Sequence, residues 1–228
     1  MNSFIKIGHR GAAGYEPENT LKSFAKALEL KCDAVEFDVH LAASGEPVVI
    51  HDDTLERTTD GKGEVSGTTL AELKKLNAGQ GERIPTLEEV LDLVNRKAIA
   101  NIELKGAGVL KPVAKIIETY VASRGWSYAD FMVSSFNHLD LWQLKELLPE
   151  VKTGALIAAA APGLCGFAKE LKSYSINLPS DCVTKELVDE AHQGEIKVFV
   201  FTVDEPDEIQ RIKALGVDGI FSDYPDRL

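Results

Sequence analysis

Carboxylates occupy alternate positions of one segment that is expected to form a β-strand. In the sequence VEFDVH, Glu36, Asp38 and His40 share one face, and the apolar residues share the other. Strands of a parallel α/β sheet are usually apolar on both faces, because helices cover both sides of the sheet. The polar row therefore indicates that this face opens at the mouth of a closed barrel, or that the strand is a half-solvated antiparallel one.

The same pattern recurs in the segment NIELK. Here Asn101, Glu103 and Lys105 share a face, and the two intervening residues are apolar. If the two strands are neighbours, three carboxylates meet, and like charges in a confined site repel one another unless a cation holds them. Three hard oxygen ligands, Glu36, Asp38 and Glu103, suit Mg²⁺ or Ca²⁺ better than zinc.

Two histidines stand at the ends of expected strands. His9 ends the segment FIKIGH and His51 ends PVVIH, so both are expected to point toward the same mouth. Imidazole titrates near neutral pH, and two such groups on either side of a scissile P–O bond can serve as base and acid. His138 and His192 lie in helical segments and are expected at the surface, and His40 is expected at the rim.

Two cations can complete such a site. Arg10 can bind two oxygens of a phosphate through its planar fork, and Lys105 supplies a compact charge. Positive charge fixed beside the non-bridging oxygens lowers the barrier to attack on phosphorus. The surrounding turn, GHRGAAG, matches neither GxxxxGK[ST] nor GxGxxG, so it is not a nucleotide-binding loop of either type. A salt-bridge cluster of these cations with the carboxylates, without a metal, is the alternative.

The elements that position these residues alternate along the chain. Thr86 and Glu89 form a capping-box pattern before one helical segment, Asn19 or Thr20 can cap another, and Pro206 stands near the first turn of a third. Strands are expected between such helices at residues 4–9, 33–40, 98–105, 131–136, 153–158, 174–179, 198–203 and 219–223. This alternation predicts an α/β fold, a (β/α)8 TIM barrel, and an open doubly wound sheet is the alternative.

One stretch interrupts the alternation. Residues 47–51, PVVIH, follow the second strand too closely for a crossover helix, which predicts a β-hairpin. Residues 52–84 then form a segment rich in Thr, Gly and charge, which we interpret as a small insertion on the barrel mouth. The chain is therefore expected to be a single domain over residues 1–228, a distorted barrel with this hairpin and insertion after the second strand.

The composition limits the classes of partner. With a formal net charge of −11 over 228 residues, the chain is too acidic for nonspecific binding to nucleic acid or stable association with anionic membranes. The three cysteines form no CxxC pair, which argues against a disulfide framework or a thiolate zinc site. The sequence shows no basic leader and no membrane-length apolar run, so we expect a cytoplasmic protein, a monomer or homodimer with a small-molecule substrate.

Several motifs occur in an order that resembles the glycerophosphodiester phosphodiesterase family, in particular its bacterial cytosolic members. They are HRG (9–11), PENT (17–20), VEFDVHLAASGEPVVIHDDTLERTT (35–59), IELK (102–105), SSF (134–136) and GVDGIFSDYP (216–225). The resemblance covers the whole chain. It implies a distorted TIM barrel, related to phosphatidylinositol-specific phospholipases C, with an insertion after the second catalytic histidine.

The resemblance also implies roles for the residues that the patterns select. His9 and His51 would act as the acid and base, and Arg10 and Lys105 would bind the phosphate. The three carboxylates would hold one divalent ion, Mg²⁺ or Ca²⁺. The implied reaction is hydrolysis of glycerophosphodiesters to sn-glycerol 3-phosphate and an alcohol. A lysophospholipase D-like activity on longer lipids and a non-catalytic diester-binding barrel are the alternatives, and the two intact proton-transfer groups argue against the second.

The chain departs from the family pattern in two places that concern substrate preference. It has Phe201 in FTVD where the family usually has Trp, and its alanine-rich loop at residues 156–163 offers no clear reader of the alcohol. Phe136 is expected to contact the glycerol or line the mouth, with core packing as the alternative. Because residues 52–84 are polar, we expect a small soluble diester rather than a membrane-embedded lipid. A hydrophobic lid formed by this segment is the alternative.

Overall fold

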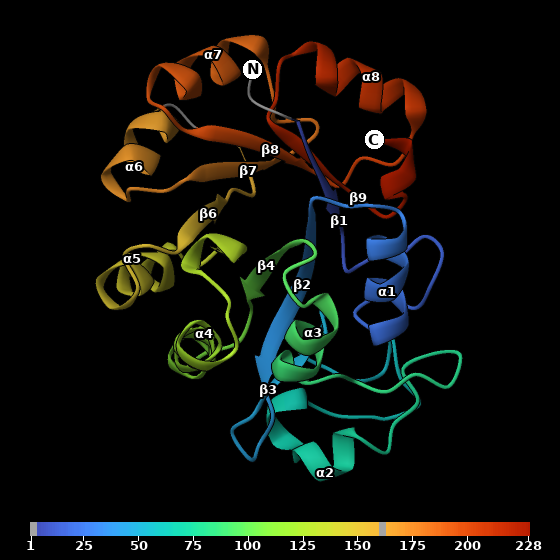
Figure 1. Ribbon diagram of the computed structural model, residues 1–228. Coiled ribbons are helices and arrows are strands. Elements are labelled where there is room, and N and C mark those ends of the chain that lie inside the picture. Colours follow the sequence, from blue (N-terminus) through green and yellow to red (C-terminus); the bar gives the residue numbers. More distant parts are fainter. Residues whose placement is uncertain (1–3, 160–162) are drawn as a thin grey trace.

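Eight parallel strands form a closed barrel in the computed structural model, which describes residues 4–159 and 163–228 (Figure 1). The strand order is β1-β9-β8-β7-β6-β5-β4-β2, and pairing of β1 with β2 closes the barrel. The strands are β1 (Ile5–Gly8), β2 (Ala34–Leu41), β4 (Ile99–Leu104), β5 (Phe131–Ser135), β6 (Lys152–Leu156), β7 (Ser175–Pro179), β8 (Lys197–Phe201) and β9 (Gly219–Ser222). The expected TIM barrel is confirmed, and the open sheet is wrong because β1 pairs with a strand on both sides.

Helices surround the barrel and begin at the residues that the capping patterns indicate. Thr20 accepts a hydrogen bond from the Ser23 N–H, and Thr86 and Glu89 form the expected capping box. The α-helices are α1 (Leu21–Glu29), α2 (Leu70–Leu73), α3 (Leu87–Val94), α4 (Leu110–Ser123), α5 (His138–Leu147), α6 (Leu164–Glu170), α7 (Lys185–Gln193) and α8 (Pro206–Ala214). Among the described residues, no helix combines the length and apolar character needed to cross a bilayer.

The two faces of each barrel strand meet different surroundings. The outward side chains Val35, Phe37 and Val39 of β2 are fully buried in the main core beneath the helices, and the Phe37 ring contacts that of Phe24 on α1 in an edge-to-face arrangement. Burying one such side chain stabilises the fold by about 1.5–3 kcal/mol. The outward face thus holds the barrel together, which leaves the inward face of the same strand free to carry polar residues.

The predicted hairpin is present after the second strand. Strand β3 (Pro47–Val49) pairs antiparallel with β2, with Val49 opposite Val39. The chain that follows contains the short helix η1 (Val65–Gly67) and α2, at the bottom of Figure 1. Together with the hairpin it packs around a small cluster of its own, which comprises Ala42, Val48, Ile50, Leu55, Val65, Leu73, Ala78 and Ile84. This cluster holds the segment in place beside the mouth.

Candidate active site

The predicted site residues meet in one pocket at the carboxyl ends of the strands. The pocket has a volume of about 190 Å³. It is lined by His9, Arg10, Glu36, His51, Glu103, Lys105, Ser134, Phe136, Leu156, Phe201, Thr202 and Phe221. Of the residues that the sequence selects, only Asp38 is absent from this lining, and it is buried beside the pocket in contact with Arg10 and Lys105. The structure therefore brings the whole predicted set together.

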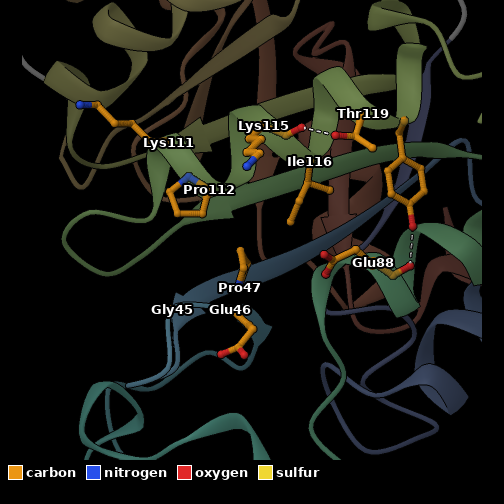
Figure 2. Close-up of a pocket in the computed structure, with 10 residues that line it drawn as sticks. Gly45, Glu46, Pro47, Glu88, Lys111, Pro112, Lys115, Ile116 and Thr119 are labelled. Carbon is orange, nitrogen blue, oxygen red and sulfur yellow. Dashed lines mark hydrogen bonds between the residues drawn. The ribbon is translucent and has the colours of Figure 1, made fainter. Parts of the chain in front are cut away.

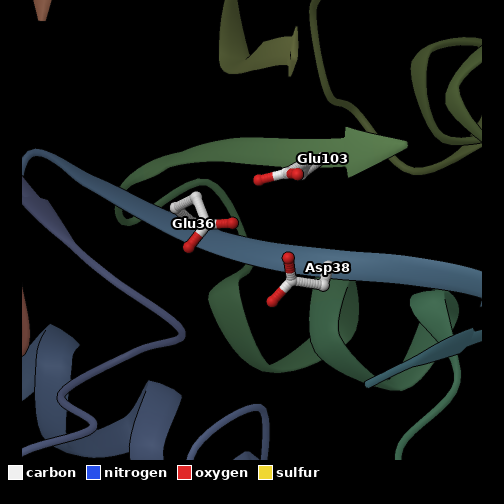
Figure 3. Close-up of side chains that lie close together, drawn as sticks. All are labelled: Glu36, Asp38 and Glu103. Carbon is white, nitrogen blue, oxygen red and sulfur yellow. The ribbon is translucent and has the colours of Figure 1, made fainter. Parts of the chain in front are cut away.

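The three carboxylates lie close together (Figure 3), and we call this buried cluster the carboxylate floor of the site. Glu36 and Asp38 are two residues apart on β2, so both point inward, and the parallel register places Glu103 of β4 opposite Asp38. One oxygen from each lies within 4.8 Å of the others. The side chains are almost completely removed from solvent, with residue exposures of 2%, 1% and 8%. Pleat and register together are sufficient to produce the cluster.

The three carboxyl groups could carry more negative charge than the neighbouring cations, Arg10 and Lys105, neutralise. Burial, together with the charge of Asp38, raises the pKa of Glu36 to about 8 and also raises the pKa of Glu103. Burial opposes ionisation of Asp38 as well, but Lys105 and Arg10 hold the pKa of that carboxyl below its ordinary value. Carboxyls whose pKa values move apart in this way share a limited supply of positive charge. A divalent cation would supply the positive charge that is still missing.

The donor set fits a hard divalent cation. Glu36 Oε2 accepts a hydrogen bond from the Arg10 N–H at 2.9 Å, whereas Glu36 Oε1 is buried without a hydrogen-bond partner among the described residues. A buried carboxylate oxygen without a partner is costly, and a cation of the Mg²⁺ or Ca²⁺ type prefers such oxygens. Lys105 Nζ lies 3.2 Å from Asp38 Oδ1 and 2.5 Å from Glu103 Oε1, so ion pairs also form part of the cluster.

His9 is oriented by a carboxylate from the last strand. It follows β1, and its Nδ1 lies 2.7 Å from Asp223 Oδ1, just after β9. Burial opposes protonation of this imidazole, but the hydrogen bond to Asp223 and the charge of Glu36 raise its pKa above the ordinary value. Because Nδ1 is engaged, Nε2 is the nitrogen available to exchange a proton with a substrate.

His51 is oriented by the residue that follows it in the sequence. Its Nδ1 lies 2.6 Å from Asp52 Oδ1. The same carboxylate accepts two hydrogen bonds from Arg57, one from Nε at 2.6 Å and one from Nη2 at 2.8 Å. These bonds from Arg57, with that from His51, lower the pKa of Asp52. Burial outweighs the neighbouring carboxylates at His51, and its pKa is lowered.

Arg57 also connects the His51 side of the site to Arg10. Its two terminal nitrogens donate to both oxygens of Glu18 at 2.8 Å, and Glu18 Oε1 accepts from Arg10 Nη1 at 2.8 Å. Sequence reasoning missed Asp52, Glu18 and Arg57 as site residues. Asp52 stands directly after His51 and Glu18 lies in the PENT motif, but no pattern indicates that Arg57 folds back onto them.

The turn after β1 positions Arg10 through two consecutive residues with positive φ. Arg10 has φ of +51° and Gly11 has φ of +88°. A Cβ on Gly11 would lie 2.4 Å from Ser23 Oγ, so only glycine fits against α1 there. Asn19, with φ of +58°, donates a hydrogen bond from Nδ2 to Asp38 Oδ2 at 2.8 Å. Asn19 thus belongs to the site, and Thr20 caps the helix.

The expectation that His40 lies at the rim is wrong. His40 is 5% exposed, and its Nε2 donates to the backbone carbonyl of His51 at 3.0 Å. Strand β3 pairs antiparallel beside the end of β2, and the chain after it brings the His51 carbonyl to this imidazole, which sequence periodicity does not reveal. His192 is exposed as expected, whereas His138 is partly buried and bonds the Leu156 carbonyl through Nε2 at 2.9 Å.

Aromatic rings form one wall of the pocket. Phe136 and Phe201 meet edge to face with ring centroids 6.3 Å apart, and Phe201 makes a similar contact with Phe221. Phe136 is 47% exposed, so it lies at the mouth rather than in the core. Of the alanine-rich loop at residues 156–163, positions 160–162 lie outside the described residues, and Leu156 lines the pocket.

A larger hollow elsewhere on the barrel lacks these chemical groups. It has a volume of about 620 Å³ and lies between the β2–β3 turn and α4 (Figure 2). Its charged side chains are Glu46, Glu88, Lys111 and Lys115, and Figure 2 shows them spread around the opening rather than converging. None of the described residues that line this larger hollow is a histidine. The pocket at the strand ends is therefore the candidate active site.

Comparison with known proteins matches residues 9–227 to the model of the glycerophosphoryl diester phosphodiesterase family. The chain is 39% identical to a glycerophosphodiester phosphodiesterase of Caldanaerobacter subterraneus subsp. tengcongensis, over 98% of this chain and 96% of the relative. It is 36% identical to one of Bacillus altitudinis, over 97% and 95%. It also superimposes on an Oleispira antarctica phosphodiesterase solved in complex with the product sn-glycerol-3-phosphate, with a TM-score of 0.89, 34% identity, and coverage of 97% and 93%.

Proposed function

The chain belongs to the glycerophosphoryl diester phosphodiesterase family, and on that premise we propose that it cleaves glycerophosphodiesters by histidine acid–base catalysis beside a divalent cation. The products are sn-glycerol 3-phosphate and an alcohol. The observation that carries the proposal is the convergence of two carboxylate-oriented histidines, two cations and three carboxylates on one small pocket. The product complex of the Oleispira antarctica phosphodiesterase supports sn-glycerol 3-phosphate as one product.

Glu36, Asp38 and Glu103 are the residues that would hold the cation, Mg²⁺ or Ca²⁺. When bound, such a cation supplies positive charge to the phosphate oxygens and helps to orient the attacking hydroxyl group. Asn19 fixes one of these ligands, because its amide donates to Asp38 Oδ2. The hydrogen bond from the Arg10 N–H fixes the Glu36 carboxylate in the same way.

Arg10 and Lys105 bind the phosphate in this proposal. Both side chains line the pocket and already contact the carboxylate floor, so they are held rather than free to swing. Preorganised positive charge of this kind stabilises the oxygens that gain charge in the transition state, at no cost of reorganisation. Glu18 restrains the Arg10 guanidinium from the opposite side.

His9 and His51 move the protons. One imidazole takes the proton of the attacking oxygen, which belongs to the glycerol 2-hydroxyl or to water, and the other gives a proton to the leaving alcohol. Each ring is tied at Nδ1 to a carboxylate, which presents Nε2 to the substrate. Phe136, Phe201 and Phe221 give the pocket an apolar wall beside these groups.

Release of sn-glycerol 3-phosphate from several glycerophosphodiesters, with and without a chelator, tests this function. We expect release by the untreated enzyme, loss after extensive chelation, and recovery on addition of Mg²⁺, Mn²⁺ or Ca²⁺. Glu36→Gln should not recover, because it removes one ligand charge from the floor. Full activity of thoroughly metal-free enzyme would show that the cation assignment is wrong.

A further inference from the structure

A second hollow lies beside the active-site pocket and shares two lining residues with it. It has a volume of about 580 Å³ and lies at the ends of β5 and β6, beside the starts of α5 and α6. Figure 1 shows these two helices next to one another on one side of the barrel. Phe136 and Leu156 line both hollows. We call the second hollow the apolar groove; its principal side chains are Phe136, His138, Leu156, Ile157, Leu164 and Phe167.

Most of the surface of the groove is apolar, and its polar part carries no charged side chain among the described residues: none is Asp, Glu, Lys or Arg. Among these described residues the one titratable ring, His138, already bonds the Leu156 carbonyl and lies against Phe167 with ring centroids 5.0 Å apart. Phe167 is nevertheless 40% exposed. Of the six large apolar side chains that the described chain exposes, five lie between residues 136 and 167, so apolar surface concentrates on this side of the barrel.

The active-site pocket cannot contain a whole substrate with a long alcohol. Pockets for drug-sized ligands usually measure about 300–1,000 Å³, whereas this pocket measures about 190 Å³. In the proposed function this pocket holds the phosphate and the glycerol, and a longer alcohol extends beyond it. On the His51 side the boundary is the charged group of Glu18, Asp52 and Arg57. On the Phe136 side the boundary consists of Phe136 and Leu156, which also line the apolar groove.

We propose that the apolar groove binds the hydrocarbon part of the leaving alcohol, so that the enzyme favours diesters whose alcohol carries an alkyl or acyl chain. This inference rests on the proposed function and names its substrate class. Hydrocarbon gains free energy by leaving water for apolar surface, and the charged boundary offers it none. The preference would arise at the β5–β6 side of the mouth and not at residues 52–84, on whose polarity the expectation of a small soluble diester depends.

The test is a series of sn-glycero-3-phospho-alkanols from ethyl to octyl, with glycerophosphoethanolamine as the polar reference. All are assayed with Mg²⁺ below their micellar concentrations. We expect kcat/KM to rise roughly 2- to 4-fold per methylene until the groove is filled, which is the gain from burying part or all of a methylene group. Phe167→Ala should flatten this rise, and Phe167→Gln should do the same with a side chain that keeps the helix. Leu147→Ala removes a comparably exposed apolar side chain outside the groove and should leave the rise intact.

The outcomes separate the groove from the proposed function. If no diester in the series releases sn-glycerol 3-phosphate, the proposed function is wrong. If glycerophosphoethanolamine and the alkyl diesters are hydrolysed with the same kcat/KM, only the groove assignment is wrong. A rise that appears only above the micellar concentration, or on addition of anionic vesicles, would indicate adsorption to an interface and would overturn the subsite.

Discussion

His9 and His51 meet the same pocket with the same imidazole–carboxylate pair, yet the two sides of the site are built differently. Asp223 on the His9 side contacts no cation among the described residues, and its carboxylate is left to the imidazole. Asp52 on the His51 side divides its carboxylate between the imidazole and Arg57. The pKa of His9 is raised and that of His51 is lowered.

The difference shows that the pKa of each imidazole depends on what else its carboxylate binds, and not only on the carboxylate itself. Two titratable groups of one kind can take opposite roles when their surroundings move their pKa values apart. Here burial opposes the charged form of both rings, and the neighbouring charges outweigh it only at His9. The predictions below test whether this asymmetry exists and whether it matters for catalysis.

The largest expected effect is loss of either imidazole. His9→Ala and His51→Ala should each lower kcat for a diester with an unactivated alcohol by roughly 10²–10⁴-fold, the usual contribution of one general acid or base. An activated aryl ester should restore most of the rate of whichever variant lacks the acid, because its leaving group needs little protonation. Near wild-type turnover of either variant on the unactivated diester would exclude the acid–base pair. Circular dichroism would confirm that the fold survives.

A smaller effect is expected from the two orienting carboxylates. Asp223→Asn and Asp52→Asn keep the shape of the side chain but remove the charge that holds the imidazole. Each should lower kcat by roughly 10–100-fold or more with little change in KM, since 10–100-fold is the range known for partners that orient metal-ligating histidines. Asp226→Asn is the matched control, since Asp226 bonds Tyr15 and contacts neither imidazole. An equal loss of kcat in Asp226→Asn would show that a disturbance of the local structure, and not the lost charge beside the imidazole, lowers the rate.

The asymmetry can be measured directly by NMR titration of the imidazoles in metal-free protein. His9 should titrate above the ordinary value of 6.5 and His51 below it, so His9 stays protonated to the higher pH. Arg57→Met should raise the pKa of His51, because Asp52 then serves the imidazole alone, and should leave His9 unaffected. If His51 had the higher pKa of the two, the asymmetry between the two sides of the site would be wrong.

The remaining prediction concerns the stability of the protein without a metal rather than its turnover. Glu36 lies near His9 and Asp38 near His51, so the carboxylate cluster belongs to both sides of the comparison. Burial and Asp38 raise the folded-state pKa of Glu36 to about 8, above its ordinary value of 4.5. The folded chain therefore holds a proton that the unfolded chain releases, and this stabilisation is lost as the pH rises from about 4.5 to about 8. Urea unfolding of metal-free protein should give a lower unfolding free energy at pH 8 than at pH 5. Glu36→Gln should reduce that difference, and an unchanged difference would contradict the assignment.

Local patterns were sufficient for most of the barrel. The sequence predicts a strand over residues 153–158, and β6 spans Lys152–Leu156; it predicts the hairpin at 47–51, and β3 spans Pro47–Val49. Alternation along a strand and capping of a helix are decided by neighbours within a few residues, so they can be read without the fold. The same alternation placed Glu36, Asp38 and Glu103 on inward faces before any strand order was known.

What the sequence determined by itself is therefore the set of groups that face the mouth, because side-chain direction follows from the period of the strand. Tertiary structure decided what each group meets. His40 is buried and bonds the His51 carbonyl, Arg57 returns from a loop to bridge Asp52 and Glu18, and the starts of α5 and α6 leave the apolar groove beside the pocket. These contacts join residues distant along the chain or depend on the course of a loop, and no local period encodes either one.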